Sequence, residues 1–287
     1  MPVALITGCS TGIGFETAAA MARAGHEAFA TMRNPGASRN LNALATKEKL
    51  PITIITMDVD SDESVRAGVQ QVLSARGRID VLVNNAGVPG GGPVEEVEIS
   101  EFRRVMETNF FGVLRCTQAV LPVMRQQQSG HIVNVSSVSG RMAMSPQAPY
   151  AASKWALEAM SEVLAQEVKR FGVRVALVEP GAIATPIFTK AKPRQWSSYY
   201  PQSKRLQALF RVSLRNPTPP TVVADKIVEI VNNGDATLRH PVGPDATGFL
   251  AWRASMTDEQ WIAWGGVESD REWQSNVKRD FGIDVQI

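Results

Sequence analysis

The chain has 287 residues, of which 44% are hydrophobic and 20% are charged, and this composition excludes an intrinsically disordered protein. The 30 basic and 28 acidic residues almost cancel, so the chain lacks the basic field that nucleic-acid binding requires. Its two cysteines make neither a disulfide framework nor a zinc site, and its three histidines are too dispersed for a metal cluster. With no secretory signal and no apolar run of about 18 residues, we expect a cytoplasmic protein that does not span a membrane.

Short apolar runs alternate with segments of helical pattern along most of the chain. The predicted strands are residues 3–6, 28–32, 52–57, 79–83, 132–135 and 173–178. The predicted helices are residues 13–24, 61–76, 102–125, 150–170 and 222–231. Alternating strands and helices form βαβ units, and nearly continuous apolar strands are typical of a parallel sheet covered on both faces. We therefore predict a single α/β domain of Rossmann type, a doubly wound parallel sheet with helices on both faces.

Two stretches depart from this alternation. Residues 186–220 combine several prolines with Trp196 and a Tyr-Tyr-Pro run, and we interpret them as a substrate lid rather than a plain surface connection. Residues 245–287 form an extension that holds four of the six tryptophans. For this extension we favour additional core or a subunit interface, with the cover of an apolar substrate pocket as the alternative.

A glycine-rich segment, Thr7-Gly8-Cys9-Ser10-Thr11-Gly12-Ile13-Gly14, lies between the first predicted strand and the first predicted helix. In a doubly wound sheet this turn binds the pyrophosphate of a dinucleotide at the N-terminus of the helix. The G-x-x-x-G-x-G spacing differs from the commoner G-x-G-x-x-G, and glycines after a strand can be simple turn residues. We predict a dinucleotide-binding loop in which Cys9 is a small structural residue and not a reactive thiol. The predicted contacts are Gly8, Ser10, Thr11, Gly12, Ile13 and Gly14.

The end of the second predicted strand indicates which dinucleotide is bound. A carboxylate there would bind the ribose 2′-hydroxyl of NAD, whereas an arginine accommodates the 2′-phosphate of NADP. The strand is followed by Arg33 and Asn34 and has no carboxylate, which favours NADP(H) over NAD(H). The alternative is that Arg33 is only a solvated surface residue.

Further motifs follow the later strands at regular intervals. They are Asp58-Val59, Asn84-Asn85-Ala86-Gly87, Asn134-Val135-Ser136-Ser137, Tyr150-Ala151-Ala152-Ser153-Lys154 and Pro180-Gly181 with Thr185. Because these motifs agree in order and spacing together with the glycine loop, residues 3–240 resemble the short-chain dehydrogenase/reductase family. Within it the chain is similar to the hydroxysteroid and retinol dehydrogenase-like branch, through residues 7–10, 30–33 and 239–243.

The resemblance implies cofactor contacts beyond the glycine loop. These are Asp58, Val59, Asn85, Ala86, Gly87, Tyr150, Lys154, Pro180, Gly181, Ile183 and Thr185. It also implies a homodimer or homotetramer that associates through the helices carrying Asn109 and Tyr150.

Tyr150 and Lys154 are the candidate acid–base pair. They are four residues apart in a predicted helix and therefore lie on the same side. A free tyrosine has a pKa of about 10, and a neighbouring ammonium favours the phenolate and lowers this value toward working pH. In isolation the two residues could be an ordinary surface pair. The family motifs favour catalysis, with Lys154 also binding the nicotinamide ribose.

Ser137 and Asn109 complete the candidate catalytic set. Ser137 precedes Tyr150 by 13 residues, the interval that the family uses, and its hydroxyl could hold the developing alkoxide. Side-chain alternation along the strand sends the neighbouring Ser136 to the other face. Asn109 matches the family's helix asparagine, which supports a proton relay to the lysine. The alternative for Asn109 is local bonding within a helix.

These residues predict reduction of a hydrophobic ketone or aldehyde by NADPH, or oxidation of the corresponding alcohol, with Tyr150 as acid or base. The alternatives are an NAD-dependent alcohol or hydroxysteroid dehydrogenase and a non-catalytic NADP(H)-binding regulatory protein, which the retained Tyr150 and Lys154 disfavour. Apolar and aromatic residues in the variable segments point to a bulky hydrophobic substrate. The predicted substrate contacts are Ser137, Met142, Met144, Tyr150, Phe188 and Trp196.

Overall fold

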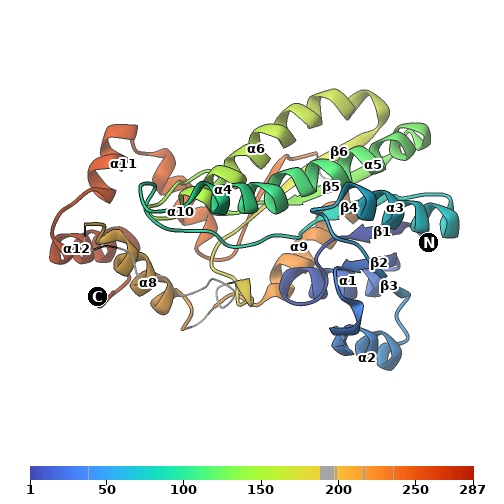
Figure 1. Cartoon of the computed structure of the whole chain (residues 1–287), viewed down its shortest axis with the longest axis horizontal. Helices are drawn as coiled ribbons and strands as arrows, with labels where there is room; N and C mark the ends of the chain where they lie inside the picture. Colours follow the sequence, from blue (N-terminus) through green and yellow to red (C-terminus); the bar gives the residue numbers. More distant parts are fainter. Residues whose placement is uncertain (38, 188–196, 198, 216, 235) are drawn as a thin grey trace.

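A seven-stranded parallel sheet forms the centre of the computed structural model, which describes the whole chain except residues 38, 188–196, 198, 216 and 235 (Figure 1). The strands are β1 (Val3–Ile6), β2 (Glu27–Met32), β3 (Ile52–Thr56), β4 (Val81–Asn84), β5 (Gly130–Val135), β6 (Val173–Pro180) and β7 (Arg239–Val242). Their order is β3-β2-β1-β4-β5-β6-β7, and every neighbouring pair is parallel. The chain therefore changes direction across the sheet between β1 and β4, the point where doubly wound sheets bind ligands.

Helices cover both faces of this sheet. The helices in the described part of the chain are α1 (Gly12–Arg23), α2 (Arg39–Glu48), α3 (Asp62–Arg76), α4 (Ile99–Met106), α5 (Gly112–Gln127), α6 (Ala148–Val168), α8 (Gln202–Ser213), α9 (Pro220–Asn233), α10 (Ala246–Ala254), α11 (Asp258–Gly265) and α12 (Asp270–Phe281). One core cluster joins the sheet to α1, α2 and α9, and a second joins it to α3, α5 and α6 on the other face (Figure 1). This confirms the predicted fold class.

The strand and helix predictions are confirmed with ends within three residues of those expected. Strands β1, β2 and β4 are buried along their whole length, as two covered faces require. Sequence analysis missed β7 and the helices α2, α8, α10, α11 and α12. The edge strand β7 contains Pro241, a residue that a sheet tolerates only at an edge or a strand end.

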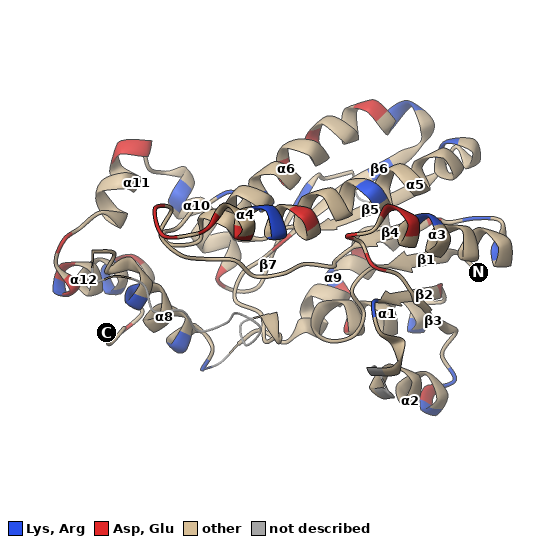
Figure 2. Cartoon of the chain, in the orientation of Figure 1, with Lys and Arg blue, Asp and Glu red and all other residues tan. Residues whose placement is uncertain are grey.

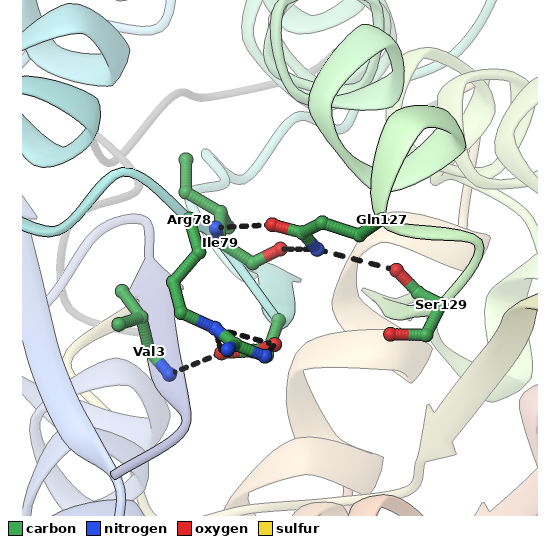
Figure 3. Close-up of polar contacts among 6 residues, drawn as sticks. Val3, Arg78, Ile79, Gln127 and Ser129 are labelled. Atoms are coloured by element: carbon green, nitrogen blue, oxygen red, sulfur yellow. Dashed lines mark hydrogen bonds and ion pairs between the residues drawn. The ribbon is translucent and has the colours of Figure 1, made fainter.

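The amino ends of the central strands are held together by local polar contacts (Figure 3). The backbone N–H of Val3 donates to Asp80 Oδ2 at 2.7 Å, and Arg78 forms an ion pair with the same carboxylate. Gln127 bonds both the N–H and the carbonyl of Ile79 and donates to the carbonyl of Ser129. These contacts fix this edge of the sheet, whereas the candidate site residues follow the carboxyl ends of the strands.

Helices α8, α10, α11 and α12 gather at the end of the molecule away from α1, α2 and α3 (Figure 1). Their own core contains Leu209 of α8 with Trp264 and Trp273 of the C-terminal extension. The tryptophan-rich extension is thus additional core, as favoured above. The predicted lid includes α8, and its residues Phe188 and Trp196 lie outside the described part of the chain.

Basic and acidic side chains are interspersed over the surface, for example along α4 and α12 (Figure 2). In the described part of the chain, no helix combines the length and apolar character needed to cross a membrane.

Candidate active site

The glycine loop joins β1 to α1 at the switch point of the sheet. Gly8 has φ +74°, in the left-handed region that glycine adopts readily. A Cβ at Gly14 would lie 2.4 Å from Asn85 Nδ2 and 2.5 Å from Gly8 O, so only glycine fits there. Between them, Cys9 is buried, its Sγ donates to Ile6 O, and burial raises its pKa to about 12. Cys9 is therefore a structural residue, as predicted.

The first turn of α1 is open to an anion. Thr11 occupies the N-cap, yet its side chain makes no capping hydrogen bond, and no acidic residue is present in the first turn. The first backbone N–H groups of a helix have no partner within the helix, and together with the helix dipole they favour a phosphate. A close-packed glycine turn leading into an uncapped helix start fits the pyrophosphate of a dinucleotide.

Two side chains hold the glycine loop in place. Thr7 Oγ1 accepts from the backbone N–H groups of Asn85 and Ala86, at 2.9 and 3.0 Å. Asn85 Nδ2 donates to the carbonyls of Thr7 and Gly8, at 2.8 and 3.2 Å. The predicted cofactor residue Asn85 thus acts on the loop itself. Sequence analysis quoted Thr7 in the motif but did not assign it this role.

Arg33 lies exposed just beyond β2, on the same side as the motif that follows β3. Its charge acts on Asp60, although burial is the larger effect and raises the pKa of that carboxyl. Asp58 Oδ1 accepts from the N–H of Asp60, and Val59 is buried. Arg33 and Asp58 are therefore both close enough to Asp60 for their charges to act on it, at the carboxyl ends of β2 and β3.

The segment after β6 approaches the glycine loop from the other side. A Cβ placed on Gly12 would lie 3.3 Å from the side chain of Thr185, so the two predicted cofactor residues are adjacent. Gly181 packs against Asp245, which also accepts from the N–H of Ala182 at 2.8 Å. Pro180 ends β6, and Ile183 is buried in the core that covers α1.

Ser137, Tyr150 and Lys154 come together at the carboxyl end of β5. Tyr150 lies in the first turn of α6 and shares a side-chain hydrogen bond with Ser137. Lys154 Nζ lies 5.7 Å from the centre of the Tyr150 ring and donates to Val135 O at 2.8 Å. Ser136 is buried and its Oγ has no hydrogen-bond partner among the described residues, and the predicted alternation stays a prediction.

The pKa of Tyr150 differs from the sequence-based expectation. Burial raises it above its usual value, and the hydrogen bond from Ser137 offsets only part of that effect. Burial also lowers the pKa of Lys154 to about 8, while Glu158 acts to raise it. The expected net lowering by Lys154 is therefore wrong for the chain on its own, because the cost of a buried phenolate outweighs an ammonium that is bonded to Val135.

Asn109 lies in a π-helical turn, Glu107–Phe111, that joins α4 to α5. Its Oδ1 accepts from the N–H of Val88 at 2.8 Å, and its Nδ2 donates to Val88 O and Ser153 Oγ. Ser153 in turn donates to Tyr150 O at 2.7 Å. The bonds are long-range rather than local, and they tie the loop after β4, including Gly87, to the turn of α6 that carries Tyr150 and Lys154. The proton relay stays a prediction.

The two predicted substrate methionines lie in different surroundings. Met142 is buried, and its N–H donates to Val138 O. Met144 packs against the tryptophan core of the C-terminal helices and lines a cavity beside it.

The model of the short chain dehydrogenase family matches residues 2–196. The chain is 36% identical to retinol dehydrogenase 8 of Bos taurus, over 87% of this chain and 84% of that one. It is 37% identical to 3-ketodihydrosphingosine reductase of Bacteroides thetaiotaomicron, over 84% and 88%.

Solved structures agree with these relatives. A short-chain dehydrogenase from Streptomyces avermitilis is similar with a TM-score of 0.80 at 33% identity, covering 92% of this chain and 96% of that one. A variant of actinorhodin polyketide ketoreductase, solved with NADPH, has a TM-score of 0.73 at 30% identity and covers 84% and 95%.

Proposed function

Since the chain belongs to the short-chain dehydrogenase family, in the branch that resembles retinol and hydroxysteroid dehydrogenases, we propose that it reduces a hydrophobic ketone or aldehyde with NADPH, using Tyr150 as the acid. Its general activity is that of an NAD(P)-dependent oxidoreductase acting on carbonyl or CH–OH groups. The observation that carries the proposal is the convergence of Ser137, Tyr150 and Lys154 at the carboxyl end of β5. The reverse oxidation of the alcohol would use the same residues.

When bound, the nicotinamide cofactor supplies the hydride that adds to the carbonyl carbon. Tyr150 donates its phenolic proton to the carbonyl oxygen, and the Ser137 hydroxyl holds the negative charge that develops there. The Lys154 ammonium stabilises the phenolate that remains on Tyr150 until solvent returns a proton. The raised pKa keeps Tyr150 protonated at neutral pH, which suits the direction of reduction.

Arg33 supports the preference for NADP(H). It is the charged residue at the end of β2, where a carboxylate would repel a 2′-phosphate and a guanidinium binds it with charge-assisted hydrogen bonds. The similarity to a ketoreductase solved with NADPH agrees with this preference. The alternative is an NAD-dependent alcohol or hydroxysteroid dehydrogenase. Turnover rates measured with NADPH and with NADH decide between the two.

The first experiment follows oxidation of NADPH and NADH with a panel of hydrophobic ketones, for the natural chain and Tyr150→Phe. We expect turnover with NADPH and a loss in the variant of roughly 10²–10⁴-fold in kcat, the usual contribution of a positioned acid. NADPH binding, followed by cofactor fluorescence, serves as the control for folding. Full turnover in Tyr150→Phe would remove this residue from the mechanism, and cofactor binding without turnover of any ketone would favour a regulatory protein.

The cofactor preference is tested separately with Arg33→Ala. A hydrogen bond to a charged group is worth about 1.5–3 kcal/mol, so we expect the KM for NADPH to rise roughly ten- to a hundredfold. The KM for NADH should change little, because NADH has no 2′-phosphate. An unchanged KM for NADPH would show that Arg33 is only a solvated surface residue.

A further inference from the structure

The side chain of Asp245, at the start of α10, is turned away from its own helix. Asp245 occupies the N-cap position of α10, where an aspartate ordinarily accepts from the first backbone N–H groups of the helix. It makes no such capping bond. Instead, Asp245 Oδ2 accepts from the backbone N–H of Ala182 at 2.8 Å, 63 residues earlier in the chain. The carboxylate therefore holds the segment after β6 rather than the end of α10.

Two glycines make room for this carboxylate. A Cβ on Gly181 would lie 2.2 Å from Asp245 Oδ1, and a Cβ on Gly243 would lie 2.9 Å from the same oxygen. Gly243 also has φ +109°, in the left-handed region that glycine adopts readily. A side chain at either position would displace the carboxylate, so the backbone on both sides is shaped to hold Asp245 against Ala182.

A second segment holds the same stretch of backbone. The N–H of Ala184 donates to Thr218 O at 2.9 Å, and the N–H of Thr218 donates to Ala182 O at 3.3 Å. These two bonds pair Ile183 with Thr218 as an isolated parallel bridge. Because the bridge uses the carbonyl before Ile183 and the N–H after it, the N–H and carbonyl of Ile183 itself point away from Thr218. In the described part of the chain this N–H bonds to no protein group.

The stretch held by Asp245 leads directly to the glycine loop. A Cβ on Gly12 would lie 3.3 Å from the side chain of Thr185, so the residue after Ala184 touches the start of α1. The family resemblance implies cofactor contacts at Gly181, Ile183 and Thr185, which alternate along this stretch. A dinucleotide bound at the glycine loop would therefore meet backbone whose position depends on Asp245.

The C-terminal extension fixes the position of Asp245 in turn. Trp252 of α10 packs edge-to-face against Trp264 of α11 and Phe281 of α12, with ring centres 5.1 and 4.6 Å apart. Such aromatic contacts hold α10 in a defined place. The extension thus reaches the backbone beside the glycine loop through a single carboxylate.

We propose that Asp245 is a positioning residue for the nicotinamide half of the cofactor, acting through the backbone of residues 181–184. The assignment deepens the proposed function and rests on it, because the dinucleotide is placed at the glycine loop. Asp245 acts through the N–H of Ala182 and touches no reacting atom. The adenosine half of the cofactor is bound at the other edge of the site and does not depend on this carboxylate.

Three variants separate this role from a general loss of structure. Asp245→Ala removes the acceptor, whereas Asp245→Asn keeps an oxygen that can accept from Ala182 in a side chain of the same size. Asp258→Ala is the matched control, because Asp258 begins α11 of the same extension but is 81% exposed and pairs with Arg253. Denaturant unfolding checks that each variant is folded.

Titration calorimetry with NADPH and with 2′,5′-ADP gives the readout and needs no turnover. The second ligand is the adenosine half of NADP and lacks the nicotinamide. In Asp245→Ala we expect the Kd for NADPH to rise at least about tenfold, the lower end of what a hydrogen bond to a charged group contributes. The Kd for 2′,5′-ADP should stay at the natural value. Asp245→Asn and Asp258→Ala should bind both ligands almost as the natural chain does.

The same comparison with NADH and ADP-ribose covers a chain that prefers NADH, because ADP-ribose lacks only the nicotinamide. Equal weakening of both members of a ligand pair in Asp245→Ala would make Asp245 a general structural residue and overturn the proposal. An unchanged Kd for the complete cofactor would overturn it as well, as would binding by Asp245→Asn as weak as that by Asp245→Ala.

Failure of the positioning role can be told apart from failure of the reductase. The expected Kd pattern without turnover of any ketone would count against the reductase and in favour of Asp245. Ketone turnover that is lost in Tyr150→Phe, together with equal Kd values in Asp245→Ala and the natural chain, would do the reverse.

Discussion

Glu158 lies one helical turn beyond Lys154 on α6, and its charge opposes the effect of burial on the pKa of that lysine. The carboxylate is buried and accepts from Arg239 Nε at 3.0 Å, while its Oε1 has no hydrogen-bond partner in the part of the chain that the structure describes. It also helps burial to raise the pKa of Glu179 to about 7, an effect that Arg141 and Arg239 oppose. The charge on Lys154 thus depends on a buried acidic group that contacts no reacting atom.

We expect Glu158→Gln to lower the pKa of Lys154 below its present value of about 8. Because the ammonium is the form that supports Tyr150, activity should decline as pH rises through the lysine pKa, and the decline should begin at lower pH in the variant. The measurement is the pH profile of kcat/KM with NADPH. Near pH 9, kcat/KM of Glu158→Gln should be several-fold lower than that of the natural chain. Near pH 6.5 the two values should differ little.

Glu162→Gln is the control, since Glu162 is the other partner of Arg239 but is exposed. If both substitutions shifted the decline of kcat/KM at high pH equally, the shift would come from the loss of a partner of Arg239 rather than from a change in the pKa of Lys154.

Residues of this kind could not be predicted from the sequence. Ser137, Tyr150 and Lys154 are fixed by their spacing within a motif, and the structure brings them together. Thr7 and Asp245 take their roles from partners 78 and 63 residues away, and a single sequence carries no mark of such contacts.

At the scale of elements, periodicity predicted the first six strands and most helices that cover the central sheet, but it missed β7 and α2. Periodicity could not predict α8, because the residue that anchors this helix is Arg205, whose side chain is buried. An arginine in a helical segment is ordinarily a surface residue, and the Asp270 carboxylate together with the carbonyls of Val267 and Glu268 makes its burial tolerable. The density of tryptophans predicted a core but not the three helices that build it.

Arg205→Met should therefore destabilise the packing of α8 against α12. Removing one partner of a buried, hydrogen-bonded charge costs up to about 3–5 kcal/mol, whereas an exposed pair is worth about 0–1 kcal/mol. Lys204 pairs with the same Asp270 from an exposed position, so Lys204→Met is the matched control and should have a small effect. Denaturant unfolding followed by tryptophan fluorescence measures both, and equal losses of stability would contradict the prediction.

On the surface of the molecule, the face formed by the π-helical turn and α6 carries exposed apolar side chains. Phe111, Trp155 and Val163 are 42%, 46% and 54% exposed. Large aromatic residues at such positions are typical of interfaces, and the family resemblance places subunit contacts on these helices.

We propose that the chain is a homo-oligomer through this face. Trp155→Glu combined with Val163→Glu should lower the mass measured by light scattering, because buried carboxylates without partners oppose association. Val222→Glu on α9 replaces an exposed apolar residue of the opposite face and should leave the mass unchanged. A monomeric natural chain would contradict the proposal directly.

Because both thiols are buried, the folded chain has no accessible cysteine for a thiol reagent. Cys116 lies in the core like Cys9, and burial raises its pKa to about 12 as well. Maleimides need an accessible thiolate, so the native protein should resist them without any cysteine being removed. A cysteine introduced at Gly248 would then carry a single fluorophore or spin label on α10. The surroundings of α10 could then be compared in solution with and without NADPH from that one reporter.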